Sequence, residues 1–226
     1  GLAESLLLTR PPPTPEQSDM ARAMAASARR MGAMANNLLD LARIESGAVR
    51  LRLEWLPMEE VLGAALAATG AILARHHTVI EVPDGMPLCR LDPVLVERVL
   101  VNLLENAAKY TPAGSTITLA ARASDGALCL SVSDNGPGLP GGRPADLLRK
   151  FERGARESAT AGVGLGLALC DAIVRAHGGR LGAGQSPAGG ARFELVFPLP
   201  SPPDMPSDGS ADGLAEAAVG APVERP

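Results

Sequence analysis

The spacing of apolar residues divides the chain into a helical first part and a mixed second part. From Glu16 to about Ala48, apolar residues recur at helical intervals along one stripe. The stripe consists of Met24, Met31, Met34, Leu38 and Leu41. A shorter helix is predicted over 2–9, and a proline-rich loop separates the two. This pattern predicts a helical hairpin, which buries enough surface only by pairing with a second copy in a four-helix bundle.

The second part alternates between short strand patterns and helical patterns. Strands are predicted at 49–55, 78–82, 88–91, 115–123, 128–133, 180–183 and 191–197. Helices are predicted at 56–74, 93–109 and 164–177. A long loop rich in Gly, Pro and charged residues is predicted over 134–162, and such loops are usually functional. The fold class is therefore α+β, with helices layered on a sheet.

These patterns give three predicted regions. Residues 1–48 are a partial dimerisation hairpin, 49–198 form the α+β domain, and 199–226 form a disordered acidic tail. The chain begins at Gly1, inside an apolar stretch, and we therefore expect it to be a fragment of a longer protein.

Charge and composition argue against two kinds of partner. The chain has 21 Lys and Arg against 25 Asp and Glu, and aromatic residues make up only 2%. A nucleic-acid partner would favour a basic surface or several stacking aromatic residues. The longest uncharged run, 61–74, is shorter than the roughly 20 residues of a membrane span. We expect neither nucleic-acid binding nor membrane contact by this chain.

The three cysteines, Cys89, Cys129 and Cys170, are widely spaced. This spacing fits neither a disulfide framework nor a zinc motif, which favours a reducing compartment. We expect all three to be small buried side chains.

One face of the helix predicted at 93–109 carries candidate chemistry. Asn102, Asn106 and Lys109 lie at i, i+4 and i+7, opposite the apolar face, with Glu105 beside them. Two amides and an ammonium group could serve a complex of Mg²⁺ and phosphate, because Mg²⁺ prefers oxygen ligands that it shares with phosphates. The alternative is a solvated polar face with a Glu–Lys pair.

Two further motifs are rich in glycine. In Asp134-Asn-Gly136-Pro-Gly138, a carboxylate at a strand end could accept from an exocyclic amine such as that of adenine, and the glycines allow close approach of a ligand. In the segment 162–167, spaced glycines open a helix and could expose N–H groups to an anion. An ordinary Asp-Gly turn and a flexible linker are the alternatives. Between the motifs, a loop with Phe151 and Arg153 could close over phosphates.

The order of these elements resembles the ATP-binding domain of sensor histidine kinases. The segment 102–110 resembles the N box of that family, 134–138 its G1 box, Phe151 its F box and 162–167 its G2 box. The resemblance covers about 17–197, and the sequence around the motifs is most similar to that of the Kdp potassium-responsive sensor kinases.

The resemblance implies a two-layer α/β sandwich that binds ATP and Mg²⁺. The implied metal ligand is Asn106, with Asn102 beside it, and Glu105 is the one candidate for a catalytic role. The implied ATP-binding residues are Asn102, Asn106, Lys109, Tyr110, Asp134, Gly136, Gly138, Phe151, Arg153, Gly162, Gly164, Leu165, Gly166 and Leu167.

In this family the γ-phosphate of ATP passes to a histidine on the dimerisation hairpin, and then to an aspartate of a response regulator. The motif that carries this histidine is absent from the chain, and His76, His77 and His177 do not match it. We therefore expect the chain to bind ATP·Mg²⁺ without phosphorylating itself. The implied partners are a second copy and a response regulator. The implied location is the cytoplasmic part of an inner-membrane sensor.

Two alternatives stay open. The same ATP fold occurs in chaperone, topoisomerase and mismatch-repair ATPases and in anti-sigma serine kinases, although the predicted hairpin does not fit them. The chain could also be a non-catalytic dimerisation and nucleotide-sensing module.

Overall fold

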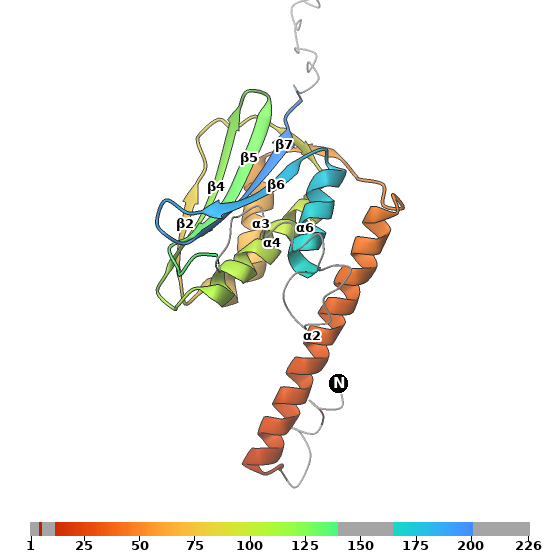
Figure 1. The fold of residues 1–226 in the computed structure, drawn as a ribbon, viewed down its shortest axis with the longest axis vertical. Coiled ribbons are helices and arrows are strands. Elements are labelled where there is room, and N and C mark those ends of the chain that lie inside the picture. Colours follow the sequence, from red (N-terminus) through yellow and green to blue (C-terminus); the bar gives the residue numbers. More distant parts are fainter. Residues whose placement is uncertain (1–4, 6–11, 140–164, 201–226) are drawn as a thin grey trace, which may run out of the picture.

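The computed structural model describes residues 5, 12–139 and 165–200 (Figure 1). The helices are α2 (Pro15–Glu45), α3 (Met58–Leu73), α4 (Pro93–Tyr110) and α6 (Leu165–Ala176). The strands are β1 (Glu54–Leu56), β2 (His77–Glu81), β3 (Cys89–Leu91), β4 (Thr116–Ser124), β5 (Ala127–Asp134), β6 (Arg180–Gln185) and β7 (Ala191–Pro198). Most of the predicted first arm of the hairpin, of the loop at 134–162 and of the acidic tail lies outside the described residues.

A five-stranded sheet forms one layer of the α/β part, in the order β2-β4-β5-β7-β6. All neighbours in this sheet are antiparallel except β2 and β4, which run parallel. Helices α3, α4 and α6 lie together on one face of the sheet (Figure 1). The predicted α+β fold with two layers is therefore confirmed.

The two short strands around Pro83-Asp84-Gly85 belong to different sheets. Strand β2 adds to the edge of the main sheet, whereas β3 pairs with β1 in a separate two-stranded sheet. Strand β1 is shorter than the predicted strand at 49–55. The backbone N–H of Arg52 donates to the carboxylate of Asp92 (2.9 Å) instead of a strand partner.

The core lies between the inner face of the sheet and the helices. Alternate residues of β4 and β5 point inward, including Leu119 and Leu130, which are fully buried. Six residues of α4 are buried against them: Val96, Val99, Leu100, Leu103, Leu104 and Ala107. Burial of each larger side chain contributes roughly 1.5–3 kcal/mol, so this face fixes the position and rotation of α4.

Helix α2 packs against α6 (Figure 1) and is also bonded to α4. The guanidinium of Arg98 on α4 donates to the Asp40 carboxylate (2.5 Å) and to the Asn37 side-chain oxygen (3.0 Å), both on α2. Leu41 of the predicted stripe is buried here. Met24, Met31 and Leu38 of the same stripe are exposed. Pairing of this stripe with a second copy stays a prediction.

None of the described helices is both long enough and apolar enough to cross a lipid bilayer.

We expect Arg98→Ala to destabilise the chain by about 1 kcal/mol and to increase hydrogen exchange over 37–41, because it removes both bonds between α4 and α2. Urea unfolding and mass-spectrometric hydrogen exchange measure the two effects. The matched control is Arg22→Ala, which breaks an exposed ion pair with Asp19 within α2. Equal effects of the two substitutions would contradict this role of Arg98.

Candidate functional site

The polar face of α4 carries two amides one turn apart. Asn102 and Asn106 are half-buried, opposite the apolar face of the helix. The side-chain nitrogen of Asn106 donates to the side-chain oxygen of Asn102 (3.0 Å). This bond orients the Asn106 amide. Within the described part of the chain, the Asn106 side-chain oxygen accepts no hydrogen bond.

Helix α6 lies close enough to α4 to contact these amides. A Cβ added to Gly166 would lie 2.5 Å from the side-chain nitrogen of Asn102. Any side chain at this position would therefore displace the amide. The absence of a Cβ at Gly166 is what allows α6 and the asparagine pair to meet.

Asp134 is the last residue of β5, and its side chain is buried, with 8% of the residue exposed. One carboxylate oxygen, Oδ1, accepts from the backbone N–H groups of Gly136 (2.8 Å) and Ala191 (3.1 Å). Among the described residues, the other oxygen accepts no hydrogen bond. A buried carboxylate is thus held by one oxygen while the other stays free for an external donor.

Glycine 190 is required by this arrangement. A Cβ at Gly190 would lie 2.2 Å from Oδ1 of Asp134. The residue just before β7 can therefore approach the carboxylate closely only because it carries no side chain.

Thr111 joins the Asp134 loop to the end of α4. A Cβ at Gly136 would lie 2.5 Å from the Thr111 methyl carbon, so the loop passes directly over this residue. The Thr111 hydroxyl donates to the carbonyl of Ala107 (2.8 Å), one turn back in the helix. The structure thus brings Asp134 and Gly136 to the carboxyl end of the helix that carries the two asparagines. Gly138 follows in the left-handed region (φ +80°).

The other predicted site residues have fewer defined contacts in the described part of the chain. Lys109 and Tyr110 are exposed at the end of α4, with the Lys109 ammonium 4.9 Å from the centre of the Tyr110 ring. Glu105 is exposed. Leu165 and Leu167 are half-buried at the amino-terminal side of α6. Four residues that the sequence also predicts lie outside the described residues: Phe151, Arg153, Gly162 and Gly164.

Three residues of this region were not predicted from the sequence. They are Thr111, Gly190 and Ala191, and they act through backbone groups or close packing. Thr111 follows the helix directly and Gly190 is the second of two adjacent glycines, so the local sequence marks both as boundary positions. Nothing local indicates that Ala191 reaches a carboxylate 57 residues earlier in the chain.

Comparison with known proteins gives a consistent result. Residues 91–201 match the family described as histidine kinase-, DNA gyrase B- and HSP90-like ATPase. The sensor protein KdpD of Escherichia coli is 46% identical over 172 residues, which are 76% of this chain and 19% of that protein. The chain thus spans about a fifth of the length of this relative.

Solved structures agree with this relationship. The full-length ShkA crystal structure, in complex with AMPPNP, is 28% identical and superposes with a TM-score of 0.72 over 89% of this chain and 42% of that one. The mycobacterial sensor histidine kinase MprB is also 28% identical, with a TM-score of 0.53 over 65% of this chain and 97% of that one. The chain therefore carries the ATPase domain of the histidine kinase, DNA gyrase B and HSP90-like family, in the form found in sensor histidine kinases.

Proposed function

We propose that the chain binds ATP with Mg²⁺ between α4, the Asp134 loop and the amino-terminal side of α6. The observation that carries this proposal is the Asp134 carboxylate, buried and held through one oxygen by two backbone N–H groups. The second oxygen is not one of the buried, unpaired side-chain atoms of the described residues, so it is open to solvent and can accept a hydrogen bond from a ligand. The partner that fits is a neutral donor on a ligand.

The free oxygen of Asp134 selects adenine by hydrogen bonding. Adenine presents an exocyclic amine, which donates to a carboxylate. Guanine presents a carbonyl oxygen at the same position, which the carboxylate repels. A site built to pair with a donor strongly rejects a base that lacks it, because the buried polar group is then left without a partner.

The asparagine pair suits a metal–phosphate complex, with unequal roles for the two residues. The Asn106 side-chain oxygen is a hard neutral ligand of the kind that Mg²⁺ takes. The Asn102 side-chain oxygen already accepts from Asn106, so Asn102 orients its neighbour rather than ligating directly. When bound, Mg²⁺ neutralises charge on the phosphates. Lys109 and the N–H groups at the start of α6 provide further positive potential for them.

We propose transfer of the ATP γ-phosphate to a histidine other than the three in this chain, followed by relay to an aspartate of a response regulator. His177 is engaged at both ring nitrogens. Its Nε2 accepts from the Asp92 N–H (3.1 Å), and its Nδ1 lies 2.8 Å from the Ile173 carbonyl oxygen. Both ring nitrogens of His76 are buried, and His77 begins β2, the edge strand at the opposite side of the sheet from β6.

We propose that the chain is organised as a partial dimerisation hairpin (1–48), an ATP-binding domain (49–198) and an acidic tail (199–226). Two copies form a homodimer through α2 and the residues before it. The location is the cytoplasmic side of an inner membrane. The likeness to KdpD supports potassium-responsive signalling, with the sensing parts in the remainder of the full-length protein.

Substitution of Asp134 by Asn is expected to weaken ATP binding by about tenfold and to reduce the preference for ATP over GTP, because an amide no longer offers two acceptor oxygens. Calorimetric titration with each nucleotide measures both effects. The matched control is Asp125→Asn, at the opposite end of the same hairpin, where φ is +51° and Asn is well tolerated. Unchanged ATP affinity in Asp134→Asn would remove the main support for the site.

A Cβ at Gly166 is expected to displace the Asn102 amide and thereby the Asn106 oxygen. Gly166→Ala should therefore lose most of the gain in ATP affinity that Mg²⁺ gives, while the affinity without Mg²⁺ changes less. Titrations with ATP in the presence and in the absence of Mg²⁺ measure these two affinities separately.

The matched control for this experiment is Gly63→Ala in α3, where a Cβ meets nothing within 4 Å. It should stabilise the helix by up to about 1 kcal/mol and leave nucleotide binding unchanged. If Gly166→Ala retains the full effect of Mg²⁺, the asparagine pair is not the metal site.

A further inference from the structure

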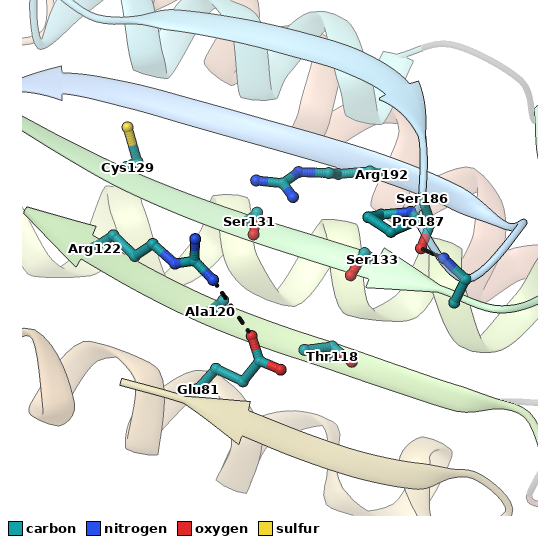
Figure 2. Close-up of a pocket in the computed structure, with 11 residues that line it drawn as sticks. Glu81, Thr118, Ala120, Arg122, Cys129, Ser131, Ser133, Ser186, Pro187 and Arg192 are labelled. Atoms are coloured by element: carbon teal, nitrogen blue, oxygen red, sulfur yellow. Dashed lines mark hydrogen bonds and ion pairs between the residues drawn. The ribbon is translucent and has the colours of Figure 1, made fainter. Parts of the chain in front are cut away.

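The outer face of the sheet, opposite the helices, carries a groove of about 250 Å³ (Figure 2). In β5, Leu128, Leu130 and Val132 point into the core, so the alternate residues Cys129, Ser131 and Ser133 point outward into this groove. The small outward residues Ala120 and Thr118 on β4 leave space beside them. The β6–β7 turn at Ser186 and Pro187 closes one end.

A serine side chain lies in the middle of the groove. Ser131 is only 7% exposed as a residue, and its hydroxyl makes no hydrogen bond within the described part of the chain. Among the described residues, the only buried side-chain polar atoms without a partner are the two ring nitrogens of His76, so solvent reaches the Ser131 hydroxyl through the groove. A polar group of a ligand can take the place of water at this hydroxyl.

Two arginines lie beside the groove. Arg122 is directly opposite Cys129 in the β4–β5 register, and its ion pair with Glu81 is long (3.9 Å) and exposed. Arg192 is directly opposite Ser133 and pairs with Glu194 (2.7 Å), also near the surface. Exposed pairs of this kind contribute little, so both guanidinium groups can exchange their partners for a bound carboxylate.

The three cysteines differ in their access to reagents. Cys89 and Cys170 are buried. Burial raises the pKa of Cys89 to about 11 and the pKa of Cys170 to about 12, which keeps both as unreactive thiols. Cys129 is only partly buried and lines the groove, contrary to the expectation that all three cysteines are buried.

We propose that this groove is a modification site, at which Cys129 forms a mixed disulfide with a small carboxylate-bearing disulfide of the glutathione class. The Cys129 thiolate sulfur attacks one sulfur of the ligand disulfide, and the bond between the two ligand sulfurs breaks. One half of the ligand stays attached to Cys129, and the other half leaves as a thiolate that takes up a proton. Cys129 is oxidised and the departing half is reduced.

Ligand chemistry and groove chemistry are complementary. The carboxylates of the ligand are acceptors for the guanidinium groups of Arg122 and Arg192. The amides of a short peptide can pair with the Ser131 and Ser133 hydroxyls. Figure 2 shows the Cys129 sulfur on the same face as both guanidinium groups. A volume of about 250 Å³ suits the half of the disulfide that stays attached to Cys129, which is of tripeptide size or smaller.

This inference does not rest on nucleotide binding. The groove lies on the outer face of the sheet, whereas α4 and its asparagines lie on the inner face. Failure of Cys129 to form the mixed disulfide and failure of the chain to bind ATP can therefore be distinguished.

The test is incubation of the full chain with oxidised glutathione, followed by mass measurement and peptide mapping. We expect one adduct, at Cys129, which a reducing agent removes and Cys129→Ser abolishes. Arg122→Gln and Arg192→Gln should each slow the reaction about two- to fivefold, the effect of losing one exposed ion pair. The matched control is Arg75→Gln, because Arg75 does not line the groove.

A neutral reagent, hydroxyethyl disulfide, separates a ligand site from a merely exposed thiol. Its reaction rate with Cys129 should not change in the arginine variants. Adducts at Cys89 or Cys170 at a similar rate would overturn the proposal. So would arginine variants that react with oxidised glutathione as fast as the unmodified chain, or that slow both reagents equally.

Discussion

The burial of helix α4 against the inner face of the sheet is the constraint on which the rest of the structure depends. Its apolar face fixes the rotation of the helix, and this rotation turns Asn102 toward α6, with Asn106 bonded to it one turn along the helix. Its carboxyl end carries Thr111 beneath the Asp134 loop. Its middle carries Arg98, which bonds to α2. A helix packed less tightly would lose all three relationships, because each depends on contacts at about van der Waals distance.

Most elements of the α/β part could be predicted from local patterns. The alternation in β4 and β5, with Asp125-Gly126 between them, predicts the observed hairpin, since both turn residues adopt positive φ. Asp92-Pro93 predicts the start of α4, where Asp92 accepts from the N–H of Leu95. The same alternation predicts that Cys129 points outward, whereas the general tendency of free cysteines favours burial.

The pairing of distant segments could not be predicted in this way. The parallel pairing of β2 with β4, and the bond from Ala191 to Asp134, join segments that share no local signal. The close approach of Gly166 to Asn102 is also a property of two packed helices rather than of either sequence. The resemblance to sensor histidine kinases supplied the expectation that these motifs converge. The structure adds the atoms that hold Asp134 and orient the asparagine pair.

Strand β5 serves both faces of the sheet, and this limits how its length can change. Its odd and even positions face opposite layers, and Asp134 stands at its end. Deletion of a single residue within the strand would exchange the two faces, placing Ser131 against the helices and Leu130 in solvent. The carboxylate would turn to the other side at the same time. Insertions and deletions among natural variants of this hairpin should therefore accumulate at Asp125-Gly126 and be rare between Ala127 and Asp134.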